Sequence, residues 1–235
     1  LTLLVSCQIE QGVARFFIDS KSHEMKQAIA TTGFFHTLII FTITGCILII
    51  GYQFFAPLLL RSNNYDNLFI LACIYFIIQS FFTFSQNLLK WQFKALRYSI
   101  ISIIYVIMTP LLVVFFSLNL DLQLIGVYCG YIISTSIACV ISLFWIKDFL
   151  NFNRINIKVW RKLLNFSYPL IFSCILLYVI QIMDRYAITY YLSFEQLGIY
   201  SVGAKIATAT MLLFQGFQLA FGPYVFREYK NDNTK

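Results

Sequence analysis

Long apolar runs without charged residues dominate the chain, and six of them are long enough to cross a membrane as helices. A membrane helix needs about 20 mostly apolar residues. The first run exceeds one span, so its helix is expected to end near Tyr52, before Pro57. A shorter run, Leu1–Ile9, continues to Phe17 as the second half of one further helix, whose start we expect to be missing. The pattern predicts an all-α fold, a polytopic transmembrane helix bundle with one partial and about six complete membrane helices. The six complete runs are Ala28–Leu60, Leu68–Leu89, Tyr98–Leu120, Leu122–Ile146, Leu163–Met183 and Ile206–Phe226.

Basic residues separate these runs in an alternating pattern. Four connections hold 14 of the 17 lysines and arginines, whereas the three connections between them hold only Arg61. Lysine and arginine gather on the cytoplasmic side of membrane proteins, so the alternation predicts both the number of spans and their orientation. Trp91, Trp145 and Trp160 lie beside the basic connections, at the headgroup level that indole rings favour. The 14 residues are Arg15, Lys21, Lys26, Lys90, Lys94, Arg97, Lys147, Arg154, Lys158, Arg161, Lys162, Arg227, Lys230 and Lys235.

Composition excludes a soluble fold. Hydrophobic residues make up 60% of the 235 residues and charged residues only 11%, whereas a soluble domain carries about 25% charged residues. The net charge of +7 is spread over four membrane-flanking loops, which argues against nucleic acid as a partner. The six cysteines lie inside apolar stretches and suit small packing residues, with no spacing that indicates a metal or a disulfide. No catalytic or cofactor motif is present, so we expect neither an enzyme nor a bound cofactor.

The segment 147–165 mixes aromatic and aliphatic residues with five cations. This mixture favours an amphipathic helix lying at the cytoplasmic surface of the membrane, although a plain loop would also fit.

Four ionisable residues fall within or near the predicted spans: Glu10, Asp184, Arg185 and Lys205. Each would cost about 2.5–3.5 kcal/mol at a bilayer centre on insertion scales, so they should face protein or water. Helical spacing places Arg185 on one polar stripe, which Asp184 borders, and Lys205 on another, and inward-facing stripes together would form a lumen. The stripes add Gln181 beside Arg185, Gln215 beside Lys205, and Tyr75, Gln79, Thr83 and Gln86 on the 68–89 helix.

Asp184 has three possible roles. It could pair with Arg185 or Lys205 as a buried structural tie, it could orient cations that face a substrate, or it could couple transport to a proton or ion, as Glu10 could. The roles do not exclude one another. A cationic lumen suits a polar, anionic cargo, because charge attraction is strong where water is scarce.

Short motifs in the C-terminal third resemble those of the polysaccharide flippases. These include the Wzx-type O-antigen transporters of the multidrug/oligosaccharidyl-lipid/polysaccharide exporter superfamily. The motifs are Ser167-Tyr168-Pro169-Leu170, Met183-Asp184-Arg185-Tyr186, the Gly-Ile-Tyr-Ser step at 198–201, Lys205-Ile206, and Gln218-Leu219-Ala220 followed by Gly222-Pro223. Residues 8–17 (QIEQGVARFF) also resemble the end of the family's second helix.

The resemblance implies that the chain covers about helices 2–8 of a two-lobe transporter. Residues 1–146 would be an incomplete N-terminal lobe, 147–165 the linker, and 166–235 the start of the C-terminal lobe. The whole protein would move undecaprenyl-diphosphate-linked oligosaccharide across a bacterial inner membrane, for surface polysaccharide biosynthesis. Arg185 and Lys205 would attract the diphosphate or acidic sugars, Asp184 would orient them, and Glu10 would be a second lumen acid. A polysaccharide polymerase and glycosyltransferases would be partners.

Three other classes compete with this interpretation. A drug/cation antiporter of the same superfamily would need an acidic ion site, whereas basic lumen residues are at least as prominent here. A membrane-embedded glycan polymerase or glycosyltransferase would need a large outer loop or a catalytic acid motif, and the loops here are short. A membrane subunit without cargo would have no reason to keep polar stripes.

Overall fold

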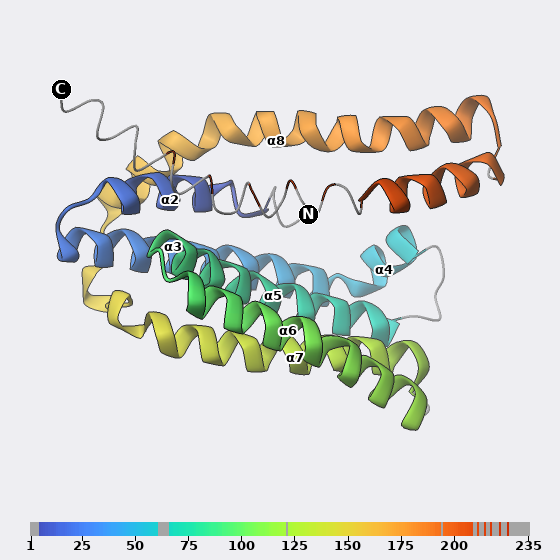
Figure 1. Cartoon of the computed structure of the whole chain (residues 1–235), viewed down its shortest axis with the longest axis horizontal. Coiled ribbons are helices and arrows are strands. Elements are labelled where there is room, and N and C mark those ends of the chain that lie inside the picture. Colours follow the sequence, from blue (N-terminus) through green and yellow to red (C-terminus); the bar gives the residue numbers. More distant parts are fainter. Residues whose placement is uncertain are drawn as a thin grey trace. The chain divides into compact units, whose positions relative to one another are not determined.

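The described part of the chain is built of helices, and no strand occurs in it (Figure 1). The computed structural model describes residues 5–60, 66–120, 122–193, 195–208, 211, 214, 217, 221 and 225. The side chains of residues 57–60, 66 and 181 lie outside this description. The chain divides into two compact units, Leu1–Ser167 (unit 1) and Tyr168–Lys235 (unit 2), and the boundary falls just before Pro169.

Unit 1 starts with a short helix and three long ones. These are α2 (Ile9–Asp19), α3 (His23–Ile50), α5 (Asp66–Trp91) and α6 (Ala95–Val114), with the short α4 (Tyr52–Leu60) between α3 and α5. A π-helical turn, Phe115–Asn119, extends α6 and leads to α7 (Gln123–Ile146). Two 3-10 turns, Lys147–Phe149 and Phe152–Arg154, then lead to α8 (Ile157–Tyr191), which continues into unit 2.

The predicted spans agree with these helices. Among the described residues, five helices are long and apolar enough to cross a membrane: His23–Ile50, Asn67–Trp91, Ala95–Asn119, Gln123–Phe149 and Ile157–Tyr191. The α3 helix ends at Ile50 and a new helix contains Pro57, as the length of the first apolar run required. Residues 195–208 are helical, so the next helix begins eleven residues before the predicted start at Ile206. Most of that predicted span lies outside the described residues.

Apolar packing holds unit 1 together. The α7 helix packs against α5 and α6, and α3 packs against α5. The core contains fully buried side chains from several of these helices, among them Phe17, Phe84, Ile101 and Ile146. By contrast, α6 exposes a row of large apolar residues, such as Val106 and Leu111, which are 65% and 64% exposed. An exposed face of this kind suits contact with lipid.

Small residues allow α7 to approach α6 closely. Gly126, Gly130, Ser134, Ala138 and Ser142 recur every four residues and are all buried, so they form one stripe along α7. A Cβ atom added to Gly130 would lie 2.7 Å from backbone atoms of Val113, and one added to Gly126 would lie 2.6 Å from the backbone of Phe116. Farther along, the Thr109 hydroxyl donates to Ser134 Oγ at 3.1 Å. Small residues at every fourth position are a common packing device between membrane helices.

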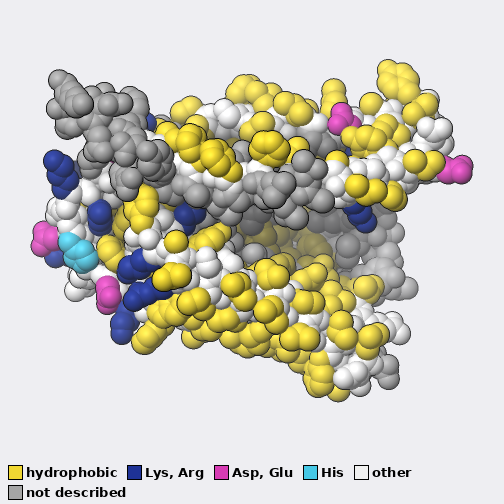
Figure 2. Space-filling view, in the orientation of Figure 1, with side chains coloured by type: hydrophobic (Ala, Val, Ile, Leu, Met, Phe, Trp, Pro, Cys, Tyr) yellow, Lys and Arg dark blue, Asp and Glu magenta, His cyan; other side chains and the backbone are white. Residues whose placement is uncertain are grey.

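Basic side chains gather at one end of the unit 1 helices, where α3 begins (Figure 2). Phe149 lies at the centre of this end. Its ring lies 5.5 Å from that of Phe17 and 5.1 Å from that of His23, and Lys94 Nζ lies 5.6 Å above it. Three basic connections that are far apart in sequence therefore meet, as the alternation of charged and uncharged loops predicted.

Candidate functional site

Glu10 is fixed inside unit 1 by a neighbouring helix. It lies half-buried in the first turn of α2, where the helix dipole favours a carboxylate. Asn87 on α5 donates from Nδ2 to Glu10 Oε2 at 2.7 Å. Lys90, about one turn beyond Asn87, is near enough for its charge to act on the Glu10 carboxylate. Glu10 therefore joins α2 to α5 through a charge-assisted hydrogen bond.

The polar stripe of α5 bonds to its neighbours in the bundle. Gln86 Nε2 donates to the Ser102 hydroxyl of α6 at 2.8 Å, and the Tyr75 hydroxyl lies 3.5 Å from that of Tyr105. The Thr83 hydroxyl donates to the Gln79 carbonyl in its own helix. These half-buried side chains were predicted to face a lumen. In the described residues Gln86 and Tyr75 contact α6, and Thr135 of α7 donates to Gln79 Oε1 at 3.5 Å.

Asp184 accepts a hydrogen bond that the sequence did not predict. The Tyr200 hydroxyl, in the helix of residues 195–208, donates to Asp184 Oδ2 at 3.1 Å. Both residues are exposed in unit 2, and Arg185 is close enough for its charge to act on the Tyr200 hydroxyl. The acid is thus tied to the following helix by a tyrosine. The described residues form no ion pair between Asp184 and Arg185 or Lys205.

The two predicted lumen cations have exposed side chains. Neither Arg185 nor Lys205 makes a side-chain hydrogen bond or ion pair with another described residue. Their backbone carbonyls accept from Thr189 and Thr208, as expected for threonines within helices. Gln181 lies in α8 with its side chain outside the description, and Gln215 lies outside the described residues. Both cations are therefore available to a ligand in the described part of unit 2.

The linker is not the continuous amphipathic helix that its composition favoured. Residues 147–156 form two 3-10 turns and extended backbone, and only from Ile157 does the chain become helical, as the start of α8. The reason lies in α3, whose side chains bond to the linker backbone. Thr31 Oγ1 accepts from Asn151 N at 2.9 Å and donates to the Phe149 carbonyl at 3.3 Å. Thr32 Oγ1 accepts from Asn156 N at 3.3 Å.

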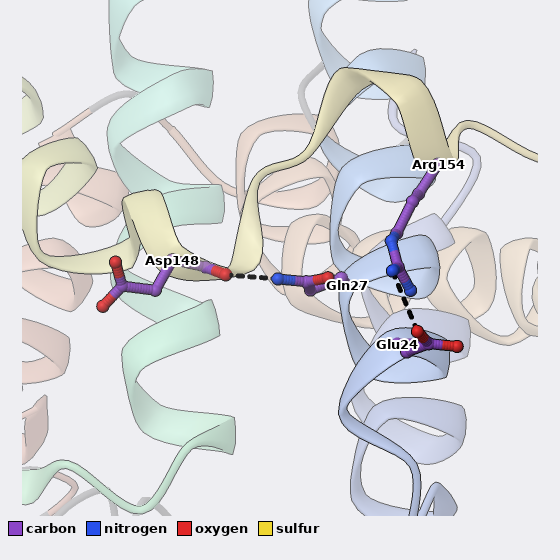
Figure 3. Close-up of polar contacts among 4 residues, drawn as sticks. All are labelled: Glu24, Gln27, Asp148 and Arg154. Atoms are coloured by element: carbon purple, nitrogen blue, oxygen red, sulfur yellow. Dashed lines mark hydrogen bonds and ion pairs between the residues drawn. The ribbon is translucent and has the colours of Figure 1, made fainter.

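Two further contacts hold the linker at the basic end (Figure 3). Gln27 Nε2 donates to the Asp148 carbonyl at 2.8 Å, and Arg154 Nη2 lies 3.0 Å from Glu24 Oε1. The Asp148 carboxylate points away from Gln27 (Figure 3). Burial lowers the pKa of Lys94, the neighbouring Arg97 lowers it further, and the charge of Asp148 opposes both.

The threonine contacts predict a measurable difference between α3 variants. Thr31→Val should loosen the linker at a cost of about 1–3 kcal/mol, because it leaves a partly buried Asn151 N–H without its acceptor. Trypsin should then cut faster after Lys147 in the folded protein. Glu24→Gln is the matched control: it removes an ion pair whose acid is 74% exposed, and should change cleavage little. Equal cleavage rates in both variants would contradict the anchoring role of Thr31.

The protein-family model described as polysaccharide biosynthesis protein matches residues 1–227, nearly the whole chain. The chain belongs to the polysaccharide biosynthesis protein family. Membership confirms the family resemblance seen in the motifs, which lie within the matched residues. No match was found among the curated proteins.

Solved structures show the fold of this polysaccharide biosynthesis family member. The MATE transporter VcmN of Vibrio cholerae, in its bent form, aligns with a TM-score of 0.79 over 97% of this chain at 11% identity. An outward-facing multidrug resistance MATE family transporter of the MOP superfamily aligns with a TM-score of 0.77 over 97% of this chain at 12% identity. The alignments cover 55% and 54% of those transporters, so the chain spans about half their length. The predicted all-α helix bundle is confirmed, with a fold similar to that of these MATE transporters.

Proposed function

We propose that the protein of which this chain is part is a flippase for lipid-linked oligosaccharide. It would move an undecaprenyl-diphosphate-linked sugar unit across the bacterial inner membrane for surface polysaccharide biosynthesis. The observation that carries the proposal is the family match over residues 1–227, together with two cations on membrane-spanning or adjacent helices. Polysaccharide precursors assembled on a lipid diphosphate are anionic, and a transporter for them needs cations where water is scarce.

Arg185 and Lys205 are the residues that we propose to bind the diphosphate or acidic sugars. Their side chains make no hydrogen bond or ion pair to other described residues, which keeps their donors available. An arginine can hold two phosphate oxygens at once, and hydrogen bonds to charged groups are the strong ones. Asp184, held by Tyr200, would position the neighbouring Arg185. Gln181 and Gln215 would be neutral donors and acceptors for the glycan, and Glu10 would position α2 against α5.

Complementation tests this proposal. The full-length protein is expressed in a bacterium that lacks its own flippase for lipid-linked oligosaccharide, and surface polysaccharide is measured at matched membrane abundance. We expect wild-type protein to restore surface glycan, and Arg185→Ala or Lys205→Ala to lower export at least about tenfold, because each removes a charged hydrogen-bond donor worth about 1.5–3 kcal/mol. Arg97→Ala, which removes a cation beside the Trp145 ring at the basic end, is the matched control. Unchanged export in Arg185→Ala would refute the site.

A drug/cation antiporter is the second candidate. It is favoured by the two MATE transporters that share the fold, and by the presence of acids at 10 and 184. The two functions differ in a simple readout. No surface glycan with any lipid-linked donor, combined with altered resistance to cationic drugs, would favour the antiporter. Under both candidate functions the protein would be a transporter, and we propose no polymerase or other enzymatic role for it. For the flippase, a polysaccharide polymerase and glycosyltransferases would act as partners.

A further inference from the structure

A groove opens at the basic end of unit 1, between the end of α2, the start of α3 and the first turns of α8. Its volume is about 510 Å³. Apolar side chains from all three helices form its walls, among them Phe16 from α2, Ile29 from α3, and Val159 and Leu163 from α8. Ile29 and Leu163 are buried and belong to the core of unit 1, so the inner wall of the groove is apolar and firmly packed.

Two lysines stand on the α8 wall of this groove. Lys158 and Lys162 lie one helical turn apart and line it together. The Lys162 ammonium lies 4.4 Å from the centre of the Phe16 ring, which holds the cation beside an apolar surface. Asp19 also lines the groove and is engaged in an interaction of its own. The lining therefore carries two positive charges and one negative charge beside the apolar walls.

The position of the groove along the helices matches the headgroup level of a membrane. Trp160 follows the lining residue Val159 in α8, and its Nε1 donates to His36 Nδ1 at 3.0 Å. An indole favours the boundary between hydrocarbon and water. The groove also lies at the end where the basic loops of unit 1 meet. A basic pocket between membrane helices on this side attracts the anionic headgroups of lipids. A free anion would gain nothing from the apolar walls, whereas a lipid would bury the start of its acyl chains against them.

We propose that this groove binds an anionic membrane phospholipid, with Lys158 and Lys162 contacting its phosphate and the apolar walls of α2, α3 and α8 contacting its acyl chains. The bound lipid would fasten the start of α8 to α2 and α3, beside the linker that Thr31 and Thr32 hold. The proposal depends on the chain lying in a membrane and not on the cargo that the transporter carries, so it can fail or hold independently of the flippase function.

The test measures lipid binding to the purified full-length protein in a neutral detergent. Phosphatidylglycerol and phosphatidylcholine are titrated separately, and lipids retained on the protein are counted by native mass spectrometry. We expect tighter retention of phosphatidylglycerol by wild-type protein. Lys158→Gln/Lys162→Gln should weaken it about 30-fold, since each lysine near an anionic lipid contributes about fivefold. The preference over phosphatidylcholine should then largely disappear.

A matched variant separates a specific groove from general attraction. Arg97→Gln/Lys147→Gln removes two cations that also lie over aromatic rings, Trp145 and Phe144, but line no part of this groove. It should retain phosphatidylglycerol within about twofold of wild type. Equal weakening in both double variants would overturn the proposal in favour of diffuse charge attraction. So would equal retention of both lipids by wild-type protein, or competition by millimolar inorganic phosphate as effective as that by phosphatidylglycerol.

Discussion

Replacing Gly130 with leucine should prevent α6 and α7 from packing and leave little folded protein. The Cβ atom alone would lie 2.7 Å from Val113 N and Cα, closer than real Cβ contacts come. These are backbone atoms, which cannot rotate out of the way as a side chain could. Overpacking a core costs about 1–3 kcal/mol and occasionally more. We expect the upper end here, because relief requires moving a whole helix and with it the Thr109–Ser134 hydrogen bond.

Substitutions of increasing size at position 130 test whether the clash with the Val113 backbone causes the loss of folded protein. Gly130→Ala should destabilise measurably and Gly130→Leu severely, as followed by thermal unfolding in detergent and by the monodisperse fraction in size-exclusion chromatography. Val140→Leu is the control on the same helix, since Val140 is 66% exposed and a larger apolar side chain there should be tolerated. If the Gly130→Leu and Val140→Leu variants unfolded at the same temperature, the inference that α6 and α7 lie too close for a large side chain at position 130 would be wrong.

The stripe that contains Gly130 shows what sequence could have revealed. Small residues at every fourth position from 126 to 142 are visible in the sequence alone. The length of an apolar run, from which the spans were predicted, does not depend on the size of its residues and so does not reveal the stripe. The span predictions succeeded for a different reason: a hydrocarbon core imposes length and apolarity on each helix separately, without regard to its neighbours. The gathering of basic loops at one end also follows from chain topology alone. The contact of Lys94 Nζ with the Phe149 ring is an example, because the two residues come from different loops.

The linker shows where local pattern fails. Residues 147–165 have the composition of an amphipathic helix, but the backbone groups of Asn151 and Asn156 donate to Thr31 and Thr32, which precede them by about 120 residues. Such long-range bonds override local helical preference. The same applies to the candidate site. Four charges within or near spans could be recognised as unusual from sequence, but the partners Asn87 and Tyr200 are set by helix packing that no periodicity encodes.

Asn87→Leu should destabilise the protein, whereas Glu10→Gln should not. Removing the amide leaves a half-buried carboxylate without its donor, at a cost of about 1–3 kcal/mol. A glutamine at position 10 keeps an oxygen that accepts from Asn87, so the link between α2 and α5 persists. The double variant Glu10→Leu/Asn87→Leu should recover part of the loss, because both polar groups are then absent. Thermal unfolding of Asn87→Leu, Glu10→Leu and the double variant measures the coupling between the two side chains, and an unaltered unfolding temperature in Asn87→Leu would exclude the link.

The Glu10→Gln variant also decides whether this acid ties helices together or couples transport to an ion. A tie needs only the hydrogen bond, which glutamine preserves, so export at matched membrane abundance should stay within about twofold of wild type. Ion coupling needs a group that gains and loses charge, and glutamine cannot do so. Loss of transport in a Glu10→Gln protein of normal stability would therefore assign Glu10 to coupling, and would strengthen the antiporter alternative. We expect retention, because Asn87 and the start of α2 already satisfy the carboxylate within unit 1.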